Sequence, residues 1–326
     1  MARYVVRRLA FALFLVFAVS SASLVLARLA PGDYAATSLG FEARRETVDE
    51  MRERLGLNKP LIAQYRDWLA AALRFDFGRS LQYDRPVRDL IPERAANTAL
   101  LSISAILLAT LVGLPLGVVA GSRRSGLLPG AIRAASLVLL STPPLLTSLF
   151  LVFLAARTGW FPIAGMRSAV VPPGGALVDL LHHLVVPAAA IGLPLAAMLE
   201  RLEAQAMTEA VAEPFVLAAF ARGVPTARVI WRDALKASLR PVASVYGLII
   251  GTLFSGSFAV EVITAWPGLG SLMLDALRTR DVYLVAGCAG AGAVFLAAGT
   301  LLSDLALALV DPRARESRES RETREA

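Results

Sequence analysis

The sequence has very little lysine, which bears directly on nucleotide chemistry. Among its 326 residues, 33 are basic, and only Lys59 and Lys236 are lysines. A phosphate-binding loop for ATP ends in Gly-Lys followed by Ser or Thr. Here the lysines follow Asn58 and Leu235, so the chain contains no such loop. Any ATP hydrolysis linked to this chain is therefore expected in a partner.

Histidine and cysteine are equally scarce. His182 and His183 are the two histidines, and adjacent residues point in different directions on a helix, so they do not form the ligand pattern of a zinc protease. We expect no metal site. Cys288 is the single cysteine and cannot make an internal disulfide. It lies in an apolar run and is expected to be a small buried residue.

Charged residues are also few, at 18% of the chain, whereas 56% are hydrophobic and the mean hydropathy is +0.61. Soluble domains average about 25% charged and 45–50% apolar residues, so an ordinary soluble enzyme is disfavoured. The net charge of +7 comes from arginines that flank apolar runs. This placement favours membrane topology over a nucleic-acid partner, which we do not expect.

Long uncharged runs predict an all-α integral membrane protein with six transmembrane helices. A helix needs about 20 apolar residues to cross the hydrocarbon core. The runs are residues 9–27, 97–122, 134–156, 184–199, 241–260 and 282–303. The fourth is the shortest and could begin earlier, at His182 and His183. A cleaved signal peptide is an alternative for the first run, although the run is longer than the usual signal core.

The basic residues of the short loops predict the orientation. With the N-terminus inside, residues 1–8, 122–133, 200–240 and 310–326 are cytoplasmic and together carry 17 Lys and Arg. The outer loops 157–183 and 261–281 together carry four. The positive-inside rule therefore places both termini in the cytoplasm of a multi-pass membrane protein.

The runs divide the chain into an N-terminal transmembrane helix (1–30), an extracytoplasmic subdomain (31–96), a five-helix core (97–310) and a disordered cytoplasmic tail (311–326). In the subdomain, Val48, Met51 and Leu55 share a helical face that ends at Gly56, and a second amphipathic stretch follows Pro60. The subdomain is interpreted either as a cap on the helices or as a docking surface for an extracytoplasmic partner.

The apolar runs offer no catalytic group. Ser136, Ser141 and Ser148 of the third run have no evident base, so intramembrane catalysis is not expected. Ion-coupled transporters keep ionisable groups at mid-membrane, whereas Glu261 and Asp304 lie at the ends of runs. This disfavours the interpretation as a secondary transporter. It favours a substrate pathway whose conformational change is driven by another protein.

The longest predicted cytoplasmic loop, residues 200–240, has helix signals of its own. Glu213 followed by Pro214 starts a short helix over 215–221, and Gly223 is placed to stop it. A second helix, 226–239, carries a basic stripe at a spacing of four, and Pro241 opens the fifth run. Two interpretations are open: an elbow whose stripe meets lipid phosphates, and a coupling helix that fits a groove on an ATPase.

The loop resembles the "EAA" loop of ABC importer permeases, in particular the dipeptide/oligopeptide/nickel branch of binding-protein-dependent inner-membrane components. The matching stretches are Glu209-Ala210-Val211, Glu213-Pro214-Phe215-Val216, Arg222-Gly223 and Pro241-Val242. Further stretches that resemble the first permease subunit are Leu29-Ala30-Pro31-Gly32-Asp33, Arg54-Leu55-Gly56-Leu57, Asp76-Phe77-Gly78-Arg79-Ser80 and Ala265-Trp266-Pro267-Gly268-Leu269-Gly270. Val211 departs from the signature, which has Ala there.

The resemblance implies a type I importer fold, a heteromeric complex and a location in a bacterial or archaeal cytoplasmic (inner) membrane. Its expected partners are a second homologous permease, two cytoplasmic ABC ATPases that hold ATP and Mg, an extracytoplasmic substrate-binding protein and membrane lipid. This chain itself would be a permease and not an enzyme, with no cofactor of its own. The resemblance places Phe215 and Phe220 as apolar anchors in the ATPase groove. The full set expected in the coupling loop is Glu209, Glu213, Pro214, Phe215, Phe220, Arg222 and Gly223.

A second candidate site follows the fifth run. Pro267, Gly268 and Gly270 force an irregular turn after Trp266, which is tolerated at membrane depth only where protein shields it. This elbow is interpreted either as a structural re-entrant turn or as a gate or a seat for the binding protein. Glu261 either caps the elbow or lines the substrate path.

The substrate is expected to be a di- or oligopeptide, with nickel, glutathione-like thiols or sugars as alternatives. A self-sufficient channel or secondary transporter with the same six helices is the rival class, and an adaptor without transport is a third. The rival predicts transport by this chain alone in liposomes. The importer predicts none without a second permease and ATPases.

Overall fold

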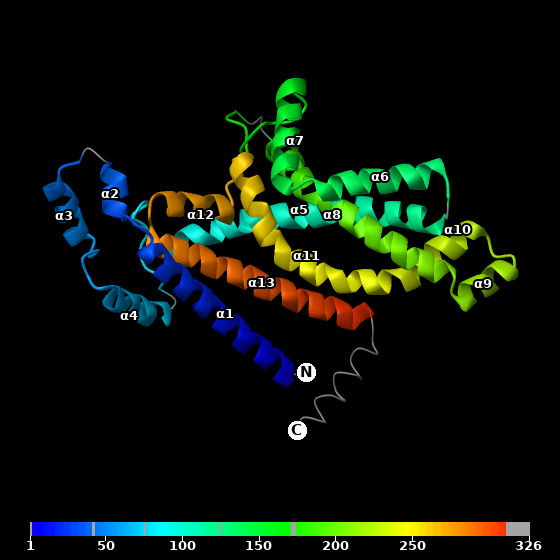
Figure 1. Ribbon diagram of the computed structural model, residues 1–326, viewed down its shortest axis with the longest axis horizontal. Helices are drawn as coiled ribbons and strands as arrows, with labels where there is room; N and C mark the ends of the chain where they lie inside the picture. Colours follow the sequence, from blue (N-terminus) through cyan, green and yellow to red (C-terminus); the bar gives the residue numbers. More distant parts are fainter. Residues whose placement is uncertain (1, 41–42, 75, 124, 171–173, 311–326) are drawn as a thin grey trace. The chain divides into compact units, whose positions relative to one another are not determined.

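The computed structural model describes residues 2–40, 43–74, 76–123, 125–170 and 174–310. The predicted tail, 311–326, lies outside these residues. The described chain is helical, and its extended pairing is a bridge between Arg79 and Pro86. Its elements, in chain order (Figure 1), are α1 (Ala2–Leu29), α2 (Tyr34–Leu39), α3 (Arg45–Arg54), α4 (Leu61–Ala72), α5 (Val87–Ser122), α6 (Leu127–Ser141), α7 (Pro144–Thr158), α8 (Ala176–Val211), α9 (Pro214–Ala221), α10 (Thr226–Arg228), the π-helix η1 (Val229–Ala234), α11 (Leu235–Ile263), α12 (Leu269–Arg278) and α13 (Val282–Val310).

Four helices of the described chain are long and apolar enough to cross a membrane, within α1, α5, α8 and α13. The number is up to five if α6 and α7 together count as one bent span. The predicted six-helix membrane architecture is thus only partly recovered, although the fifth predicted run is helical within α11. Multiple apolar helices nevertheless confirm a multi-pass membrane protein.

The third predicted run is broken. The sequence predicts one helix over 134–156, whereas the structure has α6 and α7 bent by 106° at a break between Ser141 and Pro144. The cause is local, because Thr142 is extended (φ −101°, ψ 115°) and precedes Pro143, and a residue before proline disfavours the helical conformation. Pro144 then starts α7 at its first turn, where proline loses no needed hydrogen bond.

The fourth run is longer than predicted. It begins at Ala176, before the two histidines, and continues past Leu199 to Val211, with Pro187 and Pro194 inside the helix. The predicted loop 200–240 therefore begins inside α8. At its other end, η1 and α11 run on through Pro241 without a break, so that proline does not open the fifth span.

The chain divides into two compact units. The first comprises Met1–Ala99 and Ala265–Ala297, in which α1 packs with α4 and α2 packs with α3. The second comprises Leu100–Thr264 and Ala298–Ala326, in which α8 packs with α6, α7 and α11 (Figure 1).

Glycines allow α5 to approach α8 closely in the second unit. Gly113, Gly117 and Gly121 lie one turn apart on α5 and face backbone carbonyls of α8. A Cβ atom on Gly117 would lie 2.7 Å from the carbonyl oxygen of Glu200, so no larger residue fits there without movement. Small residues at such positions let membrane helices pack backbone against backbone.

Candidate functional site: the connection from α8 to α11

The short helix α9 confirms the helix predicted in the loop. Its first residue is Pro214, and the extended Glu213 precedes it. Gly223 has φ +76°, its N–H donates to the carbonyl of Phe220 at 2.9 Å, and the N–H of Val224 donates to that of Ala219 at 3.2 Å. These are the two bonds of a Schellman motif, in which glycine adopts the left-handed conformation. Both ends of α9 are thus fixed by local sequence.

One face of α9 is anchored in an apolar cluster that we call the α9 platform. The cluster joins four helices, and buried Val216 and Ala219 are its contribution from α9. Its buried members are Val118 of α5, Met207 and Ala210 of α8, Val216 and Ala219 of α9, and Val229 and Ala234 of η1. Because side chains in such a cluster pack at crystal-like density, α9 is held rigidly against α8 and η1.

The opposite face of α9 is apolar and uncovered in the described chain. Phe215 is 51% exposed and Leu217 is 52% exposed. Phe220, the second expected anchor, packs instead on the α9 platform. Phe215 and Leu217 are two residues apart, so they lie at opposite edges of this face. Exposed apolar side chains on a helix held in place by packing are typical of an interaction site.

The remaining residues expected in the coupling loop surround this face. Glu209, at the end of α8, and Glu213, Pro214, Arg222 and Gly223 are all exposed. The basic stripe of the following helix is exposed too, and it comprises Arg228, Arg232, Lys236 and Arg240. Its predicted regular spacing is interrupted, because η1 has the wider turn of a π-helix.

Two carboxylates that the sequence analysis placed in a loop are buried in α8. Glu200 is 2% exposed and Glu203 is 0% exposed. Ser238 of α11 donates a hydrogen bond of 2.6 Å to Oε1 of Glu203, which joins α8 to α11 just after η1. The charges of Glu200, Arg201 and Glu203 predict that the apolar run ends at Leu199, whereas the helix continues to Val211. A signal that could have found them is the i, i+3 spacing of the glutamates among small residues, which continues the helical face of α8.

These carboxylates remove one argument against secondary transport. The sequence predicts transmembrane helices that are nearly free of ionisable groups, whereas α8 buries Glu200 and Glu203, and α11 buries Glu261. The class of transporter must therefore be decided on other grounds.

The second candidate site, the elbow, lies in the first unit and is tightly bonded. Trp266 is fully buried, and its Nε1–H donates to the carbonyl of Asn97 at 3.0 Å. The side-chain amide of Asn97 donates to the carbonyl of Pro267 at 2.9 Å, and the N–H of Leu269 donates to Oγ1 of Thr98 at 2.8 Å. Gly268, at the N-cap of α12, and Gly270 are buried. The Asn97-Thr98 pair therefore supplies hydrogen-bonding partners to this turn.

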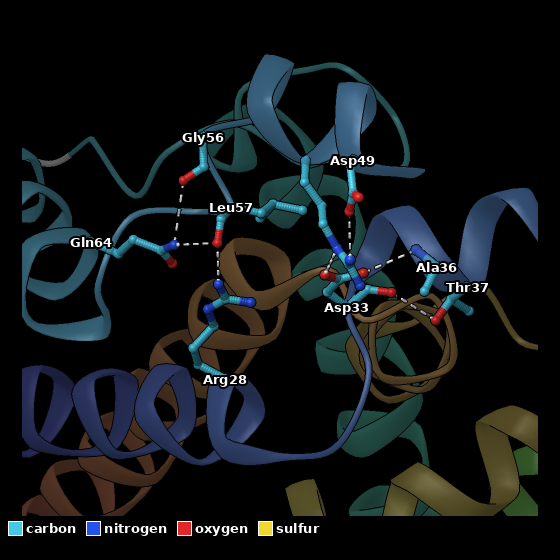
Figure 2. A network of polar contacts seen from close by, with 9 residues as sticks. Arg28, Asp33, Ala36, Thr37, Asp49, Gly56, Leu57 and Gln64 are labelled. Carbon is cyan, nitrogen blue, oxygen red and sulfur yellow. Dashed lines mark hydrogen bonds and ion pairs between the residues drawn. The ribbon is translucent and has the colours of Figure 1, made fainter. Parts of the chain in front are cut away.

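The first unit also contains a polar network that holds the chain between α1 and α4, which we call the Arg28–Gln64 network (Figure 2). Arg28 donates to the carbonyl of Leu57, and the amide of Gln64 donates to the same carbonyl at 3.2 Å. Asp33 caps α2 through the N–H of Ala36 at 2.9 Å and pairs with Nε of Arg52 at 2.7 Å. The helical pattern predicted before Gly56 is confirmed by α3, which has Leu55 as its C-cap, and the amphipathic stretch predicted after Pro60 is confirmed by α4.

Electrostatics in this network favour the ionised carboxylate. Burial on its own raises the pKa of Asp33. The hydrogen bonds from Arg52 and from the N–H of Ala36, with the charges of Arg52 and Arg28, outweigh burial and place the pKa below its ordinary value of 3.8. The same hydrogen bond raises the pKa of Arg52.

Two family models match the chain and together cover most of it. Residues 113–316 match the "Binding-protein-dependent transport system inner membrane component", and residues 1–102 match the "Binding-prot-dependent transport system membrane comp, N-term". The first match includes α9 and the whole of the α9 platform.

Curated relatives are similar over nearly their whole length. The chain is 31% identical to the oligopeptide transport system permease protein AppB of Bacillus subtilis (strain 168), over 96% of this chain and 99% of the relative. It is 31% identical to the di/tripeptide transport system permease protein DppB of Pseudomonas aeruginosa (strain UCBPP-PA14), over 98% and 100%. It is also 31% identical to the probable peptide ABC transporter permease protein y4tP of Sinorhizobium fredii (strain NBRC 101917 / NGR234), over 96% and 99%. Given these matches and its apolar helices, the chain belongs to the family of binding-protein-dependent transport system inner membrane components.

Proposed function

We propose that this chain is one of two permease subunits of an ATP-driven importer, which moves di- or oligopeptides delivered by an extracytoplasmic binding protein into the cytoplasm. The observation that carries the proposal is the near full-length similarity to permeases named for oligopeptide and di/tripeptide transport. Nickel or another small solute is the alternative cargo.

We infer six transmembrane helices with both termini in the cytoplasm. The α6–α7 pair supplies the third span as a bent segment, and α11, with 29 residues, supplies the fifth. The excess of Lys and Arg in the short loops on the side of α9 supports this orientation. The subdomain of residues 31–96 is then extracytoplasmic.

The mechanism needs a rigid contact between the permease and the ATPase, because closure of the ATPases on ATP must move the transmembrane helices as a rigid body. Phe215 and Leu217 are the exposed apolar pair that would enter the groove of the ATPase. Glu213 and Arg222 flank this pair as rim contacts. The α9 platform would pass the movement to α5, α8 and α11 through packed side chains.

ATP and Mg belong to the ATPase subunits in this proposal, since the chain has no phosphate-binding loop. A second homologous permease completes the pathway. We assign the elbow at Trp266 a structural role, because its side chain and backbone bond to Asn97 and Thr98, which leaves little freedom for a gate. Glu261, near the end of α11, is fully buried.

The decisive experiment is reconstitution. The chain would be purified gently with whatever binds it, and uptake of a radiolabelled dipeptide would be measured in proteoliposomes with and without internal ATP and added binding protein. We expect a sister permease and two ATPases in the preparation, and uptake only with ATP and binding protein. Uptake by the chain alone would support the secondary-transporter alternative and overturn the proposal.

A further inference from the structure

A cavity lies between α5, α6 and α8 in the second unit. Its volume is about 300 Å³, and its walls are almost entirely apolar. They include Val112 and Leu116 of α5, Ile132 and Leu139 of α6, and Leu193 of α8. The side chains with polar groups are Ser136 of α6 and Glu200 of α8. We call this cavity the Glu200 pocket.

Glu200 is a buried acid without a partner in the described chain. Its side chain lines the pocket, only 2% of the residue is exposed, and its Oε1 has no hydrogen-bond partner. The neighbouring acid, Glu203, accepts from Ser238 instead. Arg133 of α6 donates to the carbonyl of Ala120 at 3.0 Å, and Arg201 is exposed. The basic residues close to Glu200 in sequence or on α6 therefore do not neutralise it.

A cationic ligand would supply the charge partner that Glu200 lacks in the described chain. A buried carboxylate without a partner is strongly unfavourable, and ionisable groups within membrane helices usually mark a pathway or binding site. A metal ion fits poorly, because no group of three or more His, Cys, Asp or Glu that could hold one is found in the described chain. An ammonium group needs only one carboxylate and can donate three hydrogen bonds.

The size and lining of the pocket restrict which ammonium-bearing ligand can fit. Ligand pockets range from about 300 to 1,000 Å³, so this one suits a small group. Its apolar walls suit a hydrocarbon body beside the charge.

We propose that the Glu200 pocket receives the N-terminal ammonium group and the first apolar side chain of a peptide in transit. This inference rests on the proposed function, since the peptide is the cargo suggested there. In the proposed orientation, Glu200 lies toward the cytoplasmic end of α8, so the contact is made after the peptide has left the binding protein. A peptide with a blocked N-terminus loses this contact.

The test uses the full chain in phosphatidylcholine nanodiscs and two probes that differ in one charge. Leucinamide has a free ammonium group and an isobutyl side chain, whereas N-acetyl-leucinamide has the same body without the charge. Dissociation constants would be measured by saturation-transfer NMR titration. We expect leucinamide to bind the unmodified chain about tenfold more tightly than it binds E200Q, a difference of about 1.4 kcal/mol. N-acetyl-leucinamide should not distinguish the two.

Matched controls keep the test decisive. E93Q removes an exposed acid of α5 that belongs neither to the pocket nor to the coupling loop, and it should leave leucinamide binding unchanged. Leucinamide should also raise the melting temperature of the unmodified chain but not that of E200Q. Equal leucinamide binding by E200Q, or equal binding of the acetylated probe, overturns the proposal. So does loss of binding when phosphatidylethanolamine replaces half of the lipid, since the lipid amine is then the occupant.

A failure here is distinct from a failure of the proposed function. Loss of the leucinamide preference with intact ATP-driven dipeptide uptake rejects only the pocket. A leucinamide preference without ATP-driven uptake rejects the importer and leaves an ammonium site in a protein of another function.

Discussion

The α9 platform and the Arg28–Gln64 network are held together by opposite means. The platform consists of apolar side chains from four helices, with Val216, Met207 and Val229 fully buried. The network joins short helices through a few polar atoms, and α3 buries no residue. An apolar cluster tolerates the exchange of one apolar side chain for another of similar volume, but not a large change in volume. A polar network depends instead on particular hydrogen-bond donors and on charge. The two regions should therefore fail under different perturbations.

The largest effect is expected where α5 meets α8 beside the platform. Gly117→Ala places a Cβ 2.6 Å from the Cβ of Glu203, so the helices must separate, with a loss of about 1 to 3 kcal/mol or more. The melting temperature in detergent, measured by scanning fluorimetry, should fall by several degrees. Gly130→Ala is the matched control, because nothing lies within 4 Å of a Cβ there. Equal melting temperatures for the two variants would show that the close approach is unimportant.

The next effect separates the two faces of α9. Val216→Ser should destabilise the protein by about 1 to 3 kcal/mol, because it puts a hydroxyl into the α9 platform. Leu217→Ser, one residue further on, should leave the melting temperature unchanged since Leu217 is half exposed. It should instead reduce recovery of the ATPases in a pull-down. A loss of stability in Leu217→Ser with normal ATPase recovery would contradict this assignment.

The network should respond to loss of a donor. The amide of Gln64 donates to the carbonyls of Gly56, Leu57 and Lys59, at 3.3, 3.2 and 3.0 Å. Gln64→Leu leaves these carbonyls with fewer hydrogen-bond partners, so the free energy of unfolding should fall by about 1 to 2 kcal/mol. Hydrogen exchange of residues 56–64 should therefore accelerate. Gln205→Leu, an exposed change on α8, is the control. An unchanged exchange rate in Gln64→Leu would mean that water satisfies the three carbonyls without any loss of stability.

The smallest effect is the pH response, which should be confined to the network. Because the pKa of Asp33 is lowered by folding, its contribution is complete above the ordinary value of 3.8 and is lost as the pH falls through the lower folded value. The pair is partly exposed, so we expect about 0.5 to 1 kcal/mol. The hydrogen-exchange rate of residues 34–55, corrected for its intrinsic pH dependence, should rise in acid in the unmodified chain. In Asp33→Asn this rate should not change between neutral and acid pH. A matching acid response in the α9 platform would remove the contrast between the regions.

Local signals were sufficient for the short elements. Pro214 and Gly223 set the limits of α9, and Gly56 and Pro60 separate α3 from α4. Proline fixes its own φ, whereas these glycines adopt the left-handed conformation that other residues avoid. The exposure of Phe215 and the inward position of Phe220 could not be read from their identity. Both are apolar, and only the packing partners on α8 and η1 distinguish them.

The limits of the long helices are harder to predict, because charged residues at the end of an apolar run usually indicate a loop. Glu200 and Glu203 stay helical since their face packs against the glycines of α5, a long-range contact invisible in a single sequence. The break at Thr142 had a local signal in Pro143, which the apolar run concealed. Pro241 is tolerated inside the helix that extends from η1, although proline usually ends one.

The π-helix η1 sets the rotational phase of everything that follows it. A π-turn contains one residue more than an α-turn, and each residue of an α-helix turns the chain by about 100°. The extra residue between Val229 and Ala234 therefore determines which side of α11 faces α8, and it brings Ser238 to Glu203. A one-residue deletion in this stretch would restore a regular helix and rotate Ser238 away, whatever residue is removed. In this segment the length of the chain, as much as its composition, is the constrained quantity.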